Sequence, residues 1–154
     1  MLSSILPQHI DNTYRGHKIA LWLFGLLLFM KAAIGVNSIF NGYSVASTAD
    51  GIPLDTFTPD GAQAVVSLFA LLGLSMLILC VLGLLALIRY RAMIPLMYAL
   101  LLLEYGSRKL ILYLMPIVKT GTSSGLAVNL VLLALMILGL ALSLWSRERL
   151  PAQQ

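Results

Sequence analysis

The chain has 154 residues, of which 60% are hydrophobic and only 10% are charged. An average soluble domain carries about a quarter charged residues, so a soluble fold of this size could not hide so much apolar surface. Ten Lys and Arg residues outnumber six Asp and Glu residues, but the cations are scattered and do not indicate a nucleic-acid-binding surface. A single cysteine, Cys80, excludes an internal disulfide and a Cys-x-x-Cys site.

Four apolar stretches follow one another along the chain, and each is near or beyond the about 20 residues that a helix needs to cross a bilayer. They span approximately residues 19–40, 62–88, 92–118 and 126–145. Only helices and closed barrels satisfy their backbone hydrogen bonds in lipid, and these stretches lack the polar–apolar alternation of barrel strands. The sequence therefore predicts an all-α, polytopic membrane protein, in which residues 1–154 form a single four-transmembrane-helix bundle.

The Lys and Arg residues that flank these predicted helices indicate their orientation. Six of them fall on one side of the membrane, and the other side holds only Lys119 in the loop 119–125. The six are Arg15, Lys18, Arg89, Arg91, Arg147 and Arg149. Because cytoplasmic loops carry an excess of Lys and Arg, we expect both termini in the cytoplasm and an outer loop at residues 41–61. The expected location is the inner or plasma membrane, crossed several times.

No motif of established chemistry occurs in the sequence. It has no phosphate-binding Gly-rich loop, no His-Glu-x-x-His metal site and no Gly-x-Ser-x-Gly nucleophile. The two histidines, His9 and His17, precede the first predicted helix, whereas di-haem membrane cytochromes need histidines within helices. We therefore expect no cofactor and no metal, and the sequence leans against an enzyme without deciding the question.

Ionisable residues inside the predicted helices are the most informative feature, because charge is costly in a bilayer. They are Lys31 in the first helix and Glu104, Arg108 and Lys109 in the third. Arg108 and Lys109 lie close enough to the outer surface for their long side chains to reach water. Glu104 lies roughly 12 Å below that surface and needs a partner. Arg108 is one helical turn away, and Lys31 lies at the same depth on the first helix, so we expect an interhelical Lys31–Glu104 ion pair.

Polar side chains occupy nearly half the circumference of the outer part of the third helix, which makes contact with lipid there unfavourable. Together with groups on the first and fourth helices they form a candidate binding site. Its residues are Lys31, Glu104, Tyr105, Arg108, Lys109 and Asn129. A water-accessible pocket and simple interhelical hydrogen bonding are both open readings of this pattern. A pocket with three cations and one carboxylate would favour an anion.

Three functional hypotheses follow. The first is a non-enzymatic accessory or lipid- or amphiphile-binding membrane component, whose partners are membrane lipids, an anionic amphiphile, a second copy of the chain or another membrane protein. The second is a small oligomeric transporter or proton-coupled subunit that uses Glu104 and Lys31, because intramembrane ion pairs are typical of such pathways. The third is a membrane enzyme with Glu104 as general acid or base.

The orientation can be tested with topology reporters. Reporters fused after Asp50 and within residues 119–125 are expected to read as external, and reporters at Tyr90 and at the C-terminus as cytoplasmic, because of the charge asymmetry. An internal reading for the Asp50 fusion would reverse the predicted orientation.

Overall fold

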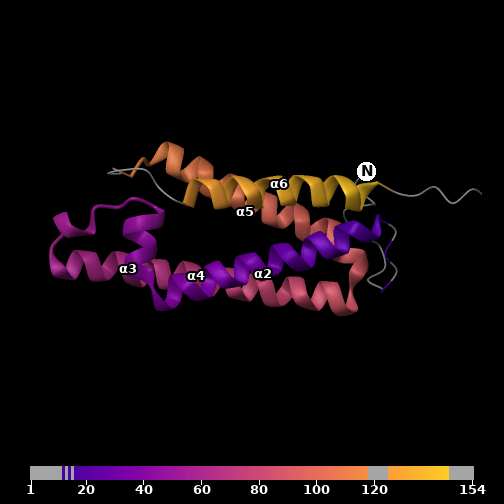
Figure 1. The fold of residues 1–154 in the computed structure, drawn as a ribbon, viewed down its shortest axis with the longest axis horizontal. Helices are drawn as coiled ribbons and strands as arrows, with labels where there is room; N and C mark the ends of the chain where they lie inside the picture. Colours follow the sequence, from indigo (N-terminus) through magenta and orange to yellow (C-terminus); the bar gives the residue numbers. More distant parts are fainter. Residues whose placement is uncertain (1–11, 13, 15, 118–124, 146–154) are drawn as a thin grey trace, which may run out of the picture.

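The fold is described by a computed structural model in which residues 12, 14, 16–117 and 125–145 are placed. All regular structure in this part of the chain is helical, with no strands. The long helices are α2 (Lys18–Phe40), α4 (Pro59–Arg89), α5 (Ile94–Leu114) and α6 (Gly125–Leu144). In Figure 1, α2 and α5 run in one direction and α4 and α6 in the other, so the first and last described residues lie at the same end.

Three of these helices, α2, α4 and α6, are long and apolar enough to cross a membrane. They support the predicted all-helical membrane protein. Helix α5 has 21 residues but carries Glu104, Arg108 and Lys109, which separates it from the three apolar helices. Three of the six cations on the predicted inner side are placed, namely Lys18, Arg89 and Arg91. Arg15, Arg147 and Arg149 lie outside the described residues, as does Lys119.

Two helices differ in extent from the prediction. Helix α4 begins at Pro59 rather than near residue 62, because the Thr58 side chain accepts a hydrogen bond from the Gly61 N–H and proline is favoured at the first helical position. The third predicted helix, 92–118, is divided into a 3₁₀ turn, Arg91–Met93, and α5. Helix α5 ends at Leu114 because Met115 precedes Pro116, and a residue before proline disfavours the α conformation. Residue 118 lies outside the described residues.

The segment 41–61, predicted as an outer loop, is folded into short helical turns. They are α3 (Gly42–Ser44), a π-helical turn (Val45–Ala49) and a 3₁₀ turn (Leu54–Thr56). Buried Ala46, Ile52 and Leu54 pack against the first turns of α4. The Tyr43 hydroxyl donates a hydrogen bond of 2.7 Å to Asp55, which raises the pKa of Tyr43 and keeps it a donor. This segment is therefore a folded cover over one end of the helices.

The packed core lies in the other half of the molecule, near the start of α2. Phe24 and Tyr98 meet edge to face with ring centroids 5.0 Å apart, and the Tyr98 hydroxyl donates to the Ala20 carbonyl oxygen at 2.9 Å. All the buried residues of α5 lie between Ile94 and Leu101. From residue 106 to its end α5 is mostly exposed, so its second half leaves the core.

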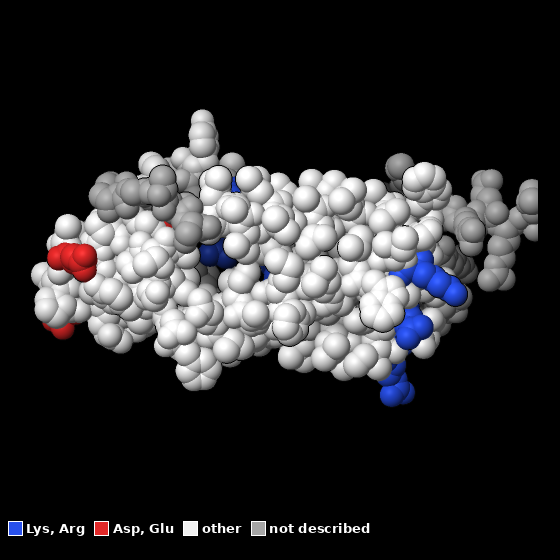
Figure 2. Space-filling model, in the orientation of Figure 1, with Lys and Arg blue, Asp and Glu red and all other residues white. Residues whose placement is uncertain are grey.

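Outside the hollow on its long side, the molecule carries its described charged residues at its two ends. Figure 2 shows acidic side chains at one end and basic side chains at the other. Asp55 and Asp60 belong to the end where α2 is followed by α4, and Arg89 and Arg91 to the end where α4 is followed by α5. The same view shows a hollow on the long side of the molecule, within which basic atoms are visible.

Helices α2 and α4 approach closely where Gly35 faces Gly73. A Cβ atom at Gly73 would lie 2.6 Å from the Gly35 carbonyl oxygen, so any side chain there would push the two backbones apart. Small residues at such crossings allow van der Waals packing that replaces the missing hydrophobic drive in lipid. By contrast, nothing lies within 4 Å of a Cβ atom built at Gly106 in α5.

These two glycines give a matched stability test. Gly73→Ala is expected to lower the free energy of unfolding by about 1–3 kcal/mol through overpacking. Gly106→Ala should raise it by up to about 1 kcal/mol, because alanine is the better helix former. Both are measured by titrating detergent-solubilised protein with a denaturing detergent, and equal effects of the two substitutions would contradict the close α2–α4 contact.

Candidate functional site

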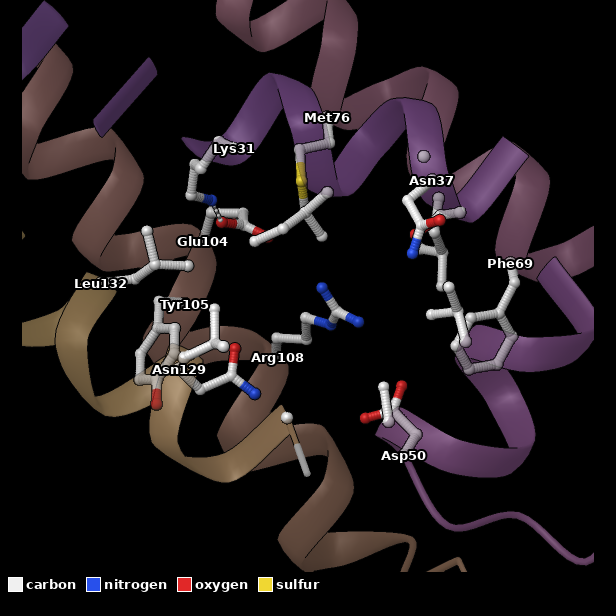
Figure 3. Close-up of a pocket in the computed structure, with 18 of the residues that line it drawn as sticks. Lys31, Asn37, Asp50, Phe69, Met76, Glu104, Tyr105, Arg108, Asn129 and Leu132 are labelled. Carbon is white, nitrogen blue, oxygen red and sulfur yellow. Dashed lines mark hydrogen bonds and ion pairs between the residues drawn. The ribbon is translucent and has the colours of Figure 1, made fainter. Parts of the chain in front are cut away.

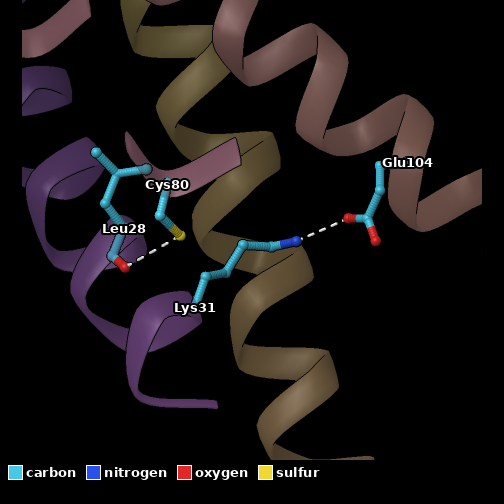
Figure 4. Close-up of polar contacts among 4 residues, drawn as sticks. All are labelled: Leu28, Lys31, Cys80 and Glu104. Carbon is cyan, nitrogen blue, oxygen red and sulfur yellow. Dashed lines mark hydrogen bonds and ion pairs between the residues drawn. The ribbon is translucent and has the colours of Figure 1, made fainter. Parts of the chain in front are cut away.

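An ion pair between α2 and α5 lies at the centre of the candidate site. The Lys31 Nζ atom is 2.7 Å from Oε2 of Glu104 (Figure 4). The interhelical pair predicted from equal depth is therefore confirmed. The two side chains differ in burial: that of Lys31 is 5% exposed, and that of Glu104 is 35% exposed.

The two charged residues also differ in whether another partner is within reach. Lys31 lies one turn after Leu28, whose carbonyl oxygen accepts a weak contact from the Cys80 thiol at 3.7 Å, and Glu104 is the only hydrogen-bond acceptor of Lys31 within the described residues. Glu104 has a second cation, Arg108, one turn further along α5. Loss of the pair would thus isolate Lys31 more completely than Glu104.

A cavity of about 320 Å³ lies beside the pair, where the second half of α5 leaves α2 and α4 (Figure 3). It is lined by α2, the π-helical turn, α4, α5 and α6. All of the candidate binding residues predicted from the sequence line it. They are Lys31, Glu104, Tyr105, Arg108, Lys109 and Asn129.

Arg108 is the residue of this set that points most directly into the cavity (Figure 3). Its guanidinium has no hydrogen bond or ion pair with any described residue. The carboxylate nearest in sequence, that of Glu104, is held by Lys31 through the same oxygen that Figure 4 marks. The guanidinium is therefore available to a group that enters the cavity.

The other polar lining residues have more local contacts. The Lys109 ammonium lies 5.7 Å from the centre of the Tyr105 ring, within the range of a cation–π interaction. At the end of α2, the side-chain oxygen Oδ1 of Asn37 accepts a hydrogen bond of 2.8 Å from the side-chain Nδ2 of Asn41. Asn129 brings an amide from α6 to the same cavity.

Several lining residues were not in the predicted set. Asp50 reaches the cavity because residues 45–49 fold as a π-helical turn. The sequence alone predicts a loop for this segment and so does not place Asp50 at the site. Phe69, Leu72 and Met76 of α4 form an apolar wall. Apolar residues occur on every side of a membrane helix, so their sequence carries no signal that selects this face.

The cavity has an excess of positive charge. Among the described residues its cations are Lys31, Arg108 and Lys109 and its carboxylates are Glu104 and Asp50, which leaves one of these cations without a counter-charge. Guanidinium, ammonium and amide donors are suited to binding an oxyanion. Among the described residues, no group of three or more His, Cys, Asp and Glu side chains is placed to hold a metal ion.

Comparison with known proteins found no matching family model, no similar curated protein and no matching solved structure.

The unequal burial of the ion pair predicts unequal effects of removing either partner. Glu104→Gln strands the buried Lys31 and should lower the free energy of unfolding by about 3 kcal/mol. Lys31→Met should cost only about 1 kcal/mol, because Glu104 can turn to Arg108. Exchanging the charges with Lys31→Glu and Glu104→Lys should recover part of the loss. Unfolding in a denaturing detergent measures all three. A larger loss for Lys31→Met than for Glu104→Gln would contradict this account.

Proposed function

We propose that this protein is a multi-pass membrane component with four crossing helices and both termini in the cytoplasm, and that it binds an anionic lipid or another anionic amphiphile. Its location would be an inner or plasma membrane. It would act as a binding or accessory component rather than as an enzyme. The proposal is supported by the charge and shape of the cavity between α2, α4, α5 and α6.

The length of α5 and the positions and partners of its charged residues are consistent with a fourth membrane crossing by this helix. Its 21 residues at 1.5 Å each span about 32 Å, close to the about 30 Å of the hydrocarbon core. Glu104 is neutralised by Lys31, and Arg108 and Lys109 are in the last two turns, from which long cationic side chains reach the interface. A helix with these features can cross a bilayer at an acceptable cost.

The single observation that carries the binding function is the unpaired Arg108 guanidinium in the cavity. The Arg108 side chain is exposed, and a guanidinium can bind a carboxylate or phosphate oxygen through two parallel hydrogen bonds. The protein does not supply that partner from its described residues. An anionic ligand headgroup would supply it.

The position of the cavity favours an amphiphile over a small soluble anion. The hollow in Figure 2 opens on the long side of the molecule, which would face lipid if the helices cross the bilayer. Phe69, Leu72 and Met76 give it an apolar wall on α4. A headgroup could contact Arg108 while its acyl chain stays against apolar surface.

A transporter or proton-coupled subunit is the second candidate, and the Lys31–Glu104 pair beside a cavity is the observation that favours it. Four helices are few for a transport path, so this function would require an oligomer. A strictly monomeric protein in lipid nanodiscs would contradict it.

Thermal unfolding in a nonionic detergent tests the binding function. Addition of lysophosphatidylglycerol, which is anionic, is expected to raise the melting temperature more than the same concentration of zwitterionic lysophosphatidylcholine, because a ligand stabilises the state that binds it. Arg108→Gln should remove most of this difference. Arg89→Gln makes the same charge change outside the cavity and should preserve it. Equal melting temperatures of the wild-type protein in both lipids would overturn the proposal.

A further inference from the structure

Glu104 has two cationic neighbours but is bonded to one of them. Its Oε2 atom is 2.7 Å from the Lys31 Nζ atom on α2, whereas Arg108 on its own helix donates no hydrogen bond to it and forms no ion pair with it. An acidic residue four positions before a basic one is the favourable order for a pair within a helix. The Glu104–Arg108 pair is therefore an available alternative that the fold does not use.

That alternative would occupy the proposed ligand site. If the Glu104 carboxylate turned to Arg108, it would take the position of an incoming oxyanion on the guanidinium. A competitor on the same helix acts at a high effective concentration, which a free ligand cannot easily match. Whatever holds Glu104 away from Arg108 thus controls whether the cavity binds an anion.

We propose that Lys31 is this positioning residue: by pairing with Glu104 it keeps the Arg108 guanidinium free for an oxyanion headgroup that carries a single negative charge. This inference rests on the proposed binding function and specifies its ligand class and its control. Lys31 does not itself contact the ligand.

The preference for a single charge comes from the balance of the cavity. Three cations and two carboxylates of the described residues line it, so one negative charge completes the balance among them. A lipid phosphodiester and a fatty-acid carboxylate both meet this condition. A phosphate monoester with two charges would leave the cavity with a net negative charge.

Binding of two probes by isothermal titration calorimetry, with the purified full chain in nonionic micelles, separates the roles of these residues. The probes are lysophosphatidylglycerol for a phosphodiester and laurate for a carboxylate, and lysophosphatidylcholine is the zwitterionic reference with no net charge. Lys31→Met is expected to weaken binding of the anionic probe by about tenfold or more, because Glu104 then neutralises Arg108. Lys31→Met combined with Glu104→Gln should bind within about threefold of the wild-type protein, because competitor and holder are both removed.

Lys109→Met is the matched control for charge. It removes one cation from the same cavity but leaves the Lys31–Glu104 pair and Arg108 in place. Its effect on affinity should stay within about threefold, clearly less than that of Lys31→Met. An equal loss in the two variants would mean that net charge alone governs binding, and would overturn the positioning role.

The remaining outcomes also decide the question. Wild-type affinity in Lys31→Met, or equally weak binding in Lys31→Met and the double variant, overturns the inference, the second because Lys31 would then contact the anion directly. If Lys31→Met does not fold, the double variant decides alone, since it buries no unpaired charge: retained binding supports the inference and lost binding overturns it.

Unchanged binding in Arg108→Gln instead overturns the proposed site itself. Tighter binding of dianionic lysophosphatidic acid than of lysophosphatidylglycerol overturns the single-charge preference.

Discussion

Lys31 is a charged side chain that the fold buries, and the need to neutralise it organises the half of the molecule that holds the cavity. Lys31 is only 4% exposed, and a charge in such surroundings is costly unless a counter-charge is bonded to it. Glu104 provides that charge from α5, a helix that otherwise leaves the core after Leu101. The ion pair therefore joins α2 to α5 at the level where apolar packing between them ends.

The two halves of the molecule differ in how they are filled. Around Phe24 and Tyr98 the helices pack closely, and a Cβ atom at Gly139 would collide with the Tyr98 ring. In the other half, a 320 Å³ space remains between α5 and the remaining helices, covered at its end by the folded segment 41–61. Packing in the first half can hold the helices in place, so that the cavity in the second half stays open. Such a division is suited to binding, since a cavity must persist when its ligand is absent.

The electrostatic arrangement makes the two carboxylates of the cavity unequal. Asp50 follows the π-helical turn, whereas Glu104 lies on α5 between two cations, Lys31 on α2 and Arg108 one turn further along α5. If Glu104 paired with Arg108 instead of Lys31, it would neutralise the charge that Arg108 presents to the cavity. Affinity for an anion would therefore depend on a side chain that need not touch it.

The sequence by itself determined that the protein is helical and membrane-embedded, because continuous apolar stretches leave no other way to satisfy backbone hydrogen bonds in lipid. It also determined the Lys31–Glu104 pair, since depth increases by a fixed 1.5 Å per residue along a helix and both residues fall at one level. Only the tertiary structure decided that Arg108 has no ion pair with another described residue, that Asp50 joins the cavity and that the apolar wall comes from α4. Those features depend on the rotation and separation of helices and on a folded connection, which no local pattern of residues encodes.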